Sequence, residues 1–393
     1  MTVRTDQRVA VQIPGNPDRI TRRAAVGLVA GGVAAAASRP TIAAARQQAT
    51  PVGTPGGLAV EGISYDTGTK YPEWDVLSRE EWAEETVRRD LQAIRDDLHA
   101  NAVTLFGSDA GRVADGAAIA SGLGLSVWIQ PRMFDAEQDA LLDQLGEFAS
   151  EAERLRAGGV DVTLNAGVEL SIFAAGIIPG ATYAERIPTL LETLDQLPEY
   201  NERLNALLGS AATVARDAFD GPLTYGSGEW EGVDWTPFDI VGVDLYLHAG
   251  NREGYAEQLR SYEQFGKPVV ITEFGCCAYE GADDAGGSGY AIIDWSADPP
   301  RLNGDYVRSE DTQAETIGGL LDLYAAEGIH GAFVYTFVEP NQTYSPDPQF
   351  DLDMASFGIV KVFPEGSGQG YAESGYWEPK AAFGAIAERF AAG

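Results

Sequence analysis

The chain has 393 residues, of which 45% are hydrophobic and 22% are charged. This composition supplies enough apolar side chains for a packed core and argues against an intrinsically disordered chain. The formal net charge of −32 argues against nucleic acid or an anionic membrane as a partner, because phosphate binding requires clustered Lys and Arg. A neutral partner is therefore expected, and the sequence does not indicate an oligomeric state.

Residues 1–45 have the pattern of an export signal. A Thr-Arg-Arg motif at 21–23 precedes an apolar, Gly/Ala-rich run at 24–37, and three alanines at 43–45 offer a cleavage site. The pattern resembles a twin-arginine signal and predicts a secreted or envelope-associated protein without stable membrane insertion after cleavage. The alternative is an uncleaved anchor, although the apolar run is short for a membrane span. The Gln, Thr, Pro and Gly residues of 46–57 predict a flexible leader to the folded domain.

From residue 58 onward, short apolar runs rich in β-forming residues alternate with longer amphipathic stretches. Eight parallel strands separated by helices are the pattern of a barrel. We therefore expect residues 58–393 to form a single-domain α/β protein, a (β/α)8 TIM barrel with long strand-to-helix loops. The predicted strands are Val60–Tyr65, Ala102–Phe106, Leu125–Ile129, Val162–Asn165, Leu223–Gly226, Ile240–Tyr246, Pro268–Thr272 and Gly331–Phe337.

The connecting helices have signals of their own. Ser78 followed by Glu81 has the spacing of a capping box, which predicts that the first helix begins there. Apolar residues fall on one helical face within Glu310–Ala326, and Pro379 precedes a final helix predicted over Lys380–Ala391.

Two glutamates lie where the active site of such a barrel is expected, at the carboxyl ends of strands. Glu169 follows the fourth run, and Glu273 ends the seventh. Two carboxyls in one cleft can divide the work of glycoside hydrolysis, because one that is held neutral donates a proton while the other attacks. A separation of about 5–5.5 Å implies retention of configuration, and about 6.5–9.5 Å implies inversion.

The motifs around these glutamates resemble those of the large clan of retaining (β/α)8 glycoside hydrolases. The resemblance rests on Glu169 after strand four, on Thr-Glu-Phe-Gly at 272–275 and on Gly-Val-Asp-Leu-Tyr at 242–246. It implies that Glu169 is the acid/base and Glu273 the nucleophile, and that Tyr246 hydrogen-bonds the nucleophile. It further implies hydrolysis of a neutral poly- or oligosaccharide without a cofactor.

Two positions differ from that clan. Val168 stands directly before Glu169, where the relatives have an asparagine that holds the sugar 2-hydroxyl, and Asn165 lies nearby but out of register. The eighth run ends in Phe-Val-Glu at 337–339, where the relatives have a tryptophan platform. A non-catalytic barrel that binds sugars or envelope components is therefore the alternative hypothesis.

A second likeness concerns bacterial barrel proteins labelled "abortive infection protein". It rests on Glu-Phe-Gly-Cys-Cys at 273–277 and on Asp-Leu-Asp-Met-Ala-Ser at 351–356. The two cysteines are the only ones in the chain, and because they are adjacent they provide no disulfide framework.

Aromatic and polar residues near strand ends complete the predicted cleft, since pyranose faces stack on aromatic rings. Arg132 has two interpretations: a sugar ligand, or the partner of Glu273 in an ion pair at the barrel rim. Glu229 and Glu231 are expected to be solvated. With three histidines in the chain, a histidine metal centre is not expected. The predicted substrate-binding residues are Tyr246, Trp230, Arg132, Asn165, His248 and Tyr65.

Overall fold

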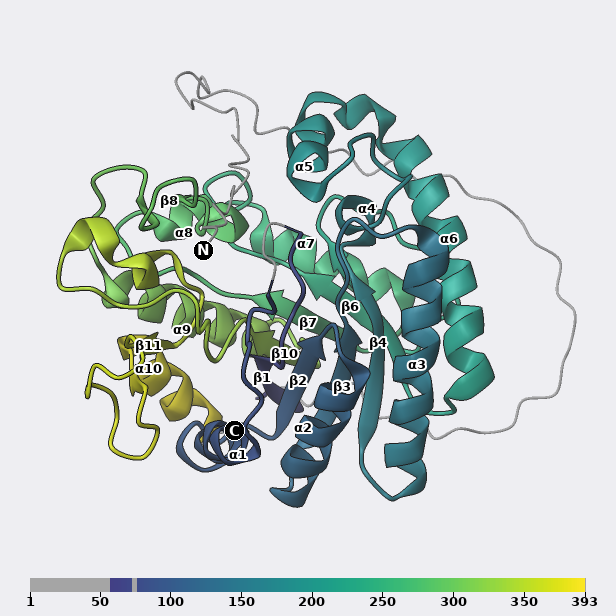
Figure 1. The fold of residues 1–393 in the computed structure, drawn as a ribbon. Helices are drawn as coiled ribbons and strands as arrows, with labels where there is room; N and C mark the ends of the chain where they lie inside the picture. The colour runs from purple at the N-terminus through teal and green to yellow at the C-terminus, as the bar shows by residue number, and fades with distance from the viewer. Residues whose placement is uncertain (1–56, 73–75, 393) are drawn as a thin grey trace, which may run out of the picture. The chain divides into compact units, whose positions relative to one another are not determined.

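A computed structural model describes residues 57–72 and 76–392, all of which belong to one compact unit. The predicted export signal at 1–45 and nearly all of the predicted leader lie outside the described residues. The structure is a closed barrel of eight parallel strands in the order β1-β2-β3-β4-β5-β6-β7-β10 (Figure 1). The strands are β1 (Val60–Asp66), β2 (Ala102–Gly107), β3 (Ser126–Pro131), β4 (Val162–Val168), β5 (Leu223–Gly228), β6 (Val241–Asp244), β7 (Val269–Phe274) and β10 (Gly331–Val334). The predicted (β/α)8 fold and all eight predicted strands are confirmed.

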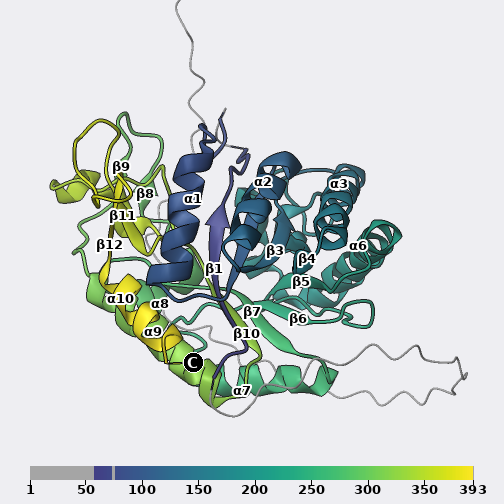
Figure 2. The same cartoon turned by 90° about the horizontal axis from the view of Figure 1, so that it is seen from below.

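Helices surround the strands, as Figure 2 shows from below. Among the described residues, no helix is long and apolar enough to cross a membrane. The α-helices are α1 (Glu84–Gln92), α2 (Ala110–Gly122), α3 (Gln138–Ala157), α4 (Leu170–Phe173), α5 (Tyr183–Glu192), α6 (Leu197–Ala218), α7 (Tyr255–Ser261), α8 (Ala282–Ala285), α9 (Glu310–Ala326) and α10 (Ala381–Phe390). Shorter 3-10 or π segments are η1 (Ala93–Asp97), η2 (Leu194–Gln196), η3 (Tyr262–Phe265), η4 (Gly286–Ser288), η5 (Pro348–Phe350) and η6 (Leu352–Ala355).

The capping box predicted at Ser78 is wrong. The Ser78 hydroxyl donates to the carboxylate of Asp66 at the end of β1, and helix α1 begins only at Glu84. Asp66 also accepts hydrogen bonds from the Gly68 amide and the Thr69 hydroxyl. The Ser78 hydroxyl therefore bonds to Asp66, which is distant in sequence, and does not cap the helix as the local spacing predicted.

The barrel interior is closed near its centre by a few large side chains. Phe333 of β10 packs against Trp128 of β3, with ring centroids 4.8 Å apart. A Cβ atom at Gly62 of β1 would lie 2.1 Å from the Phe333 ring, so only glycine fits there. Because successive residues of a strand point to opposite faces, Tyr65, three residues after Gly62, points outward to the helices.

Two antiparallel hairpins extend the loops, β8 (Ile293–Asp294) with β9 (Arg301–Leu302) and β11 (Val360–Val362) with β12 (Trp377–Pro379). The loop after β10 is anchored by charge. Asp353 pairs with Lys380 at 2.9 Å and with Arg308 at 2.7 Å, and neither Lys380 nor Asp353 has an exposed side chain. Cys276 and Cys277 are both buried and free.

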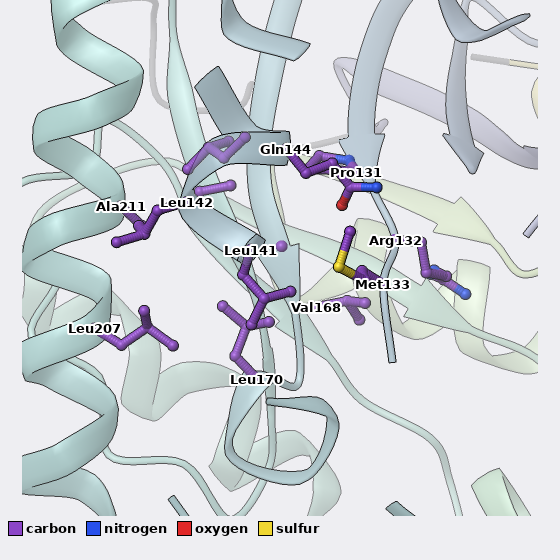
Figure 3. A pocket seen from close by; sticks show the side chains of 13 residues that line it. Pro131, Arg132, Met133, Leu141, Leu142, Gln144, Val168, Leu170, Leu207 and Ala211 are labelled. Carbon is purple, nitrogen blue, oxygen red and sulfur yellow. The ribbon is translucent and has the colours of Figure 1, made fainter. Parts of the chain in front are cut away.

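A cavity of about 20 Å³ lies outside the barrel wall, between β3, β4 and helices α3 and α6. Figure 3 shows leucines converging on it, including Leu141, Leu170 and Leu207, whereas the guanidinium of Arg132 points away. The volume suits at most a water molecule, and the lining is largely apolar. The cavity is therefore a packing gap rather than a ligand site.

Candidate active site

The fourth strand ends in a bulge that positions Glu169. The register between β4 and β5 shifts between Asn165 and Val168, and Gly167 has φ of 150°. The side-chain oxygen of Asn165 accepts from the amides of Gly167, at 3.2 Å, and Gly226, at 3.1 Å. A bulge of this kind redirects the side chain that follows it.

Glu169 itself has a backbone conformation that residues other than glycine rarely adopt, with φ 41° and ψ 43°. Its amide donates to the carbonyl of Gly226 at 2.9 Å, and its carbonyl accepts from Ile172 at 2.9 Å, so that α4 begins directly after it. Figure 1 shows α4 and α5 together at one end of the barrel. Left-handed residues cluster at functional sites, where the surroundings must hold them in place.

Glu169 is a partly exposed residue whose carboxyl lies among other acids. Burial, followed by the negative charge of Glu273 and then that of Glu231, raises the pKa of Glu169 well above its usual range. Arg132 opposes this shift, but it is the smaller influence. Glu169 therefore holds its proton to higher pH than a free glutamate does, and the influence of Glu273 on it indicates that the two carboxyls are neighbours.

Glu273, at the end of β7, is 8% exposed and paired with a cation. Its Oε1 accepts from a guanidinium nitrogen of Arg132, which follows β3. Strands β3 and β7 lie opposite each other in the strand order, so this contact crosses the mouth of the barrel. Of the two interpretations of Arg132, the ion pair with Glu273 at the barrel rim is therefore present.

Arg132 is buried, and both terminal nitrogens of its guanidinium donate hydrogen bonds, whereas its Nε has no partner within the described residues. It is 5% exposed, it donates to Gln130 at 2.7 Å, and its guanidinium carbon lies 4.0 Å from the centre of the Phe106 ring. It also donates to the Tyr335 hydroxyl at 3.4 Å. A guanidinium stacked and bonded in this way keeps Glu273 in a fixed position.

Tyr246 and Asp244, from the end of β6, approach Glu273 from one side. The Tyr246 hydroxyl donates to Glu273 Oε2 at 3.4 Å, and burial followed by the charge of Glu273 raises the pKa of Tyr246 well above its usual range, so the hydroxyl keeps its proton. Asp244 accepts from Thr272 at 2.6 Å, and burial, then Glu273 and Glu169, raises its pKa as well. Asp244 was not predicted from the sequence.

The loop after β5 places Trp230, Glu229 and Glu231 beside the site. Trp230 is partly exposed and donates from Nε1 to the Ser171 hydroxyl at 2.9 Å. Glu229 lies 3.0 Å from His248 Nε2. Burial raises the pKa of Glu229, but the hydrogen bond and charge of His248, together with hydrogen bonds from Asn251 and Gln258, outweigh that effect and lower it. The expectation that Glu231 is solvated is wrong, because it accepts backbone and hydroxyl hydrogen bonds within the loop.

Two predicted substrate ligands are corrected. Tyr65 has no exposed surface, and its hydroxyl donates to Asp90 on α1 at 2.8 Å, so it belongs to the packing between barrel and helix. The alternation along β1, with Gly62 inward, could have indicated this. Asn165 is 1% exposed and holds the β4 bulge, which makes it a structural residue.

The ring at the end of the eighth strand is Tyr335 rather than a residue of 337–339. Tyr335 stacks with Phe106 at 5.7 Å between ring centroids, beside Arg132, whereas Phe337 is fully buried. Sequence reasoning missed Tyr335 because the predicted strand extended three residues too far.

A group of four aromatic rings from the loops after β1, β3 and β4 adjoins the site and was also not predicted. Phe134 is its centre, with centroids 4.9, 4.6 and 5.4 Å from the other three rings. Each of the four residues is partly exposed. The group, here called the aromatic wall, consists of Tyr71, Phe134, Phe173 and Tyr183.

No protein-family model matches the sequence, and no curated protein matches it significantly. The barrel is similar to solved glycoside hydrolases. A GH113 β-1,4-mannanase is 12% identical, with a TM-score of 0.54, over 85% of this chain and 99% of that one. The GH113 β-mannanase of Alicyclobacillus acidocaldarius is 16% identical, with a TM-score of 0.52, over 86% and 98%.

The family 1 β-glucosidase of Thermotoga maritima is 10% identical, with a TM-score of 0.50, over 87% of this chain and 99% of that one. The resemblance to (β/α)8 glycoside hydrolases is thus confirmed at the level of the fold. The likeness to the proteins labelled "abortive infection protein" is not shown by these comparisons.

Proposed function

We propose that the protein is a retaining glycoside hydrolase that acts on a neutral poly- or oligosaccharide outside the cell. The observation that carries the proposal is the contrast between two carboxyls at one barrel mouth. Burial and neighbouring acids raise the pKa of Glu169, whereas Glu273 is paired with Arg132. A neutral carboxylic acid beside an ionised carboxylate is the pair that glycoside hydrolysis needs.

The reaction follows from these two states. Glu169 gives its proton to the glycosidic oxygen as that oxygen leaves the anomeric carbon, and Glu273 forms a bond to the same carbon. Oε2 is the better placed oxygen for attack, because Oε1 is held by Arg132, whereas Oε2 accepts only a long hydrogen bond of 3.4 Å from Tyr246 within the described part of the chain. Glu169 then takes a proton from the water that attacks the glycosyl-enzyme and frees Glu273.

Support for a neutral sugar comes from charge. The formal net charge is −32, from 59 acidic and 27 basic residues. A chain of this charge would repel polyanionic glycans. The partly exposed Trp230 and the aromatic wall offer ring faces on which neutral pyranoses can stack.

A mechanism-based 2-deoxy-2-fluoro glycoside with a good leaving group tests the proposal. In a panel of gluco, manno and galacto configurations, at least one reagent should inactivate the protein and add one glycosyl unit to the peptide that contains Glu273. The Glu273→Gln variant should show no such labelling. Labelling of another residue, or turnover with inversion in an NMR time course, would refute the proposal.

A non-catalytic sugar-binding barrel is the second candidate, and the Arg132–Glu273 ion pair favours it. An ion pair across the mouth can serve stability alone, and Val168 replaces the asparagine that the resemblance implies. This candidate predicts that wild type binds glycans on an array but releases no product from any of them. It also predicts equal glycan affinity for wild type and Glu273→Gln.

A further inference from the structure

The backbone that follows Glu169 is held by two side chains from the β5 region. The amide of Leu170 donates to the Tyr225 hydroxyl at 2.7 Å, and the amide of Ser171 donates to Glu231 Oε1 at 2.9 Å. The Tyr225 hydroxyl in turn donates to Glu231 Oε2 at 2.8 Å. We call this arrangement, made of Tyr225, Glu231 and the two amides, the amide clamp.

The amide clamp is rigid because Glu231 is bonded on both oxygens. Oε2 also accepts from the Gly228 amide at 3.1 Å, and the neighbouring Trp230 holds the Ser171 hydroxyl at 2.9 Å. The left-handed conformation of Glu169 is costly and persists only where its surroundings fix it. A carboxylate that accepts backbone amides makes strong bonds of this kind.

Glu231 also acts on Glu169 through charge. The charged and titratable groups that face Glu169 are Glu273 on β7, Glu231 and Glu229 after β5, Asp244 and Tyr246 at the end of β6, and Arg132 after β3. Among the charges that raise the pKa of Glu169, that of Glu231 ranks second after Glu273. Burial raises the pKa of Glu231 itself to about 7, against the opposing effect of its hydrogen bonds.

We propose that Glu231 is a positioning residue for Glu169: it fixes the backbone after Glu169 through the amide clamp, and its negative charge favours the protonated form of Glu169. The inference rests on the proposed function for the role of Glu169 as the acid. Glu231 takes no part in the reaction itself, but through Glu169 it would help to set the pH range in which the reaction runs.

The first test is the pH profile of kcat/KM for Glu231→Gln on an aryl glycoside that the wild type hydrolyses. Without the negative charge, Glu169 should lose its proton at lower pH, so the basic limb should move down by about half a pH unit or more. Glu231→Asp is the matched control, because it keeps the charge while displacing the carboxylate. It should lower kcat without moving the basic limb, and an unmoved limb in Glu231→Gln overturns the proposal.

A second test does not depend on turnover. Protein labelled with [δ-13C]glutamate is titrated by NMR, and the Glu169 signal is assigned as the one that Glu169→Gln removes. In the wild type this signal should respond to the ionisation of Glu231 near pH 7, and in Glu231→Gln its midpoint should be lower. A Glu169 signal that shows no response near pH 7 in the wild type overturns the proposal even if Glu231→Gln does not fold. Absence of turnover with an intact response would refute the proposed function alone.

Discussion

The ends of strands β4 and β7 carry the same residue type in opposite settings. At β4, a bulge and a left-handed backbone present Glu169 among acids, and its pKa is raised by burial and by Glu273. At β7, the register with β6 and β10 also shifts beside Glu273, but Glu273 stays within the strand and meets Arg132 from the far side of the barrel. The two glutamates therefore differ in that Glu169 has a left-handed backbone and lies among acids, whereas Glu273 is paired with a cation.

The difference shows how one fold assigns two roles to one side chain. The barrel brings strand ends to a common mouth, but the strands do not decide which carboxyl holds a proton. That choice depends on which carboxyl Arg132 contacts and on which acids surround the other carboxyl. Substitutions at Glu273, Glu169 and Arg132 each remove one part of this contrast.

The largest effect is expected when the nucleophile is lost. Glu273→Gln should lower kcat by about 10⁴-fold or more, because the variant lacks the carboxylate that forms the bond to the anomeric carbon. Initial rates on an aryl glycoside measure the loss, with Glu147→Gln as the control, since Glu147 is exposed on helix α3. Residual turnover within 100-fold of the wild type would move the nucleophile to another residue.

Loss of Glu169 should lower the rate by an amount that depends on the leaving group of the substrate. Glu169→Gln should lower turnover of glycosides with poor leaving groups by about 10²- to 10⁴-fold, the range of general acid catalysis. With an activated leaving group the first step needs no acid, and azide should then restore turnover and yield a glycosyl azide, because azide needs no general base. Equal losses for good and poor leaving groups, without azide rescue, would contradict the acid/base role.

Loss of Arg132 should remove the positive charge that distinguishes the setting of Glu273 from that of Glu169. Arg132→Met leaves Glu273 buried without a partner, which should lower the free energy of unfolding by about 3–5 kcal/mol. Urea denaturation at pH 7 measures the change. In the Arg132→Met/Glu273→Gln double variant the loss should be clearly smaller, because no lone charge remains. Equal losses in single and double variants would show that Arg132 acts by packing on Phe106 alone.

The sequence predicted the barrel well, because each strand is a short run of β-forming residues that the core requires. It also placed Glu169 and Glu273, since the carboxyl end of a strand is a position that can be read along the chain. Glu231 was misjudged: its neighbours Glu229 and Gly232 are exposed, whereas Glu231 is only partly exposed and is held by contacts with Tyr225 and the Ser171 amide that no local pattern shows.

The errors at Tyr65 and Ser78 have different causes. Tyr65 could have been placed correctly from the alternation along β1, because Gly62 packs inside the barrel against Phe333. Ser78 could not, because its partner Asp66 lies twelve residues earlier, in another element. The contact of Arg132 with Glu273 across the barrel was named from the sequence only as one of two options.

Stability should respond to pH through the buried acids. Burial raises the pKa of Glu231 to about 7, so ionisation is harder in the folded state than in the unfolded one. Its contribution is therefore complete below its ordinary pKa of 4.5 and is lost as pH rises through about 7. The free energy of unfolding should fall by about 1–3 kcal/mol between about pH 5 and pH 7.5, and Glu231→Gln should reduce that fall.

Glu61 on β1 provides the matched control for this pH effect. Burial raises its pKa to about 7 as well, but Glu61 is not among the groups that act on Glu169. Glu61→Gln should therefore also flatten the dependence of stability on pH, whereas the basic limb of kcat/KM should stay in place. A limb that moves in both variants would mean that the profile reports unfolding.

The smallest effect is expected at Tyr246. Its hydroxyl donates to Glu273 Oε2 over 3.4 Å, a long bond, and its ring lies 5.4 Å from that of Phe357. Tyr246→Phe keeps the ring and removes only the bond, so kcat should fall by about 2- to 10-fold, equivalent to about 0.5–1.5 kcal/mol. Tyr371→Phe, at an exposed tyrosine in the loop before β12, is the control. A loss above 100-fold would mean that the hydroxyl tightens onto Glu273 in the transition state and contributes to catalysis as much as the acid does.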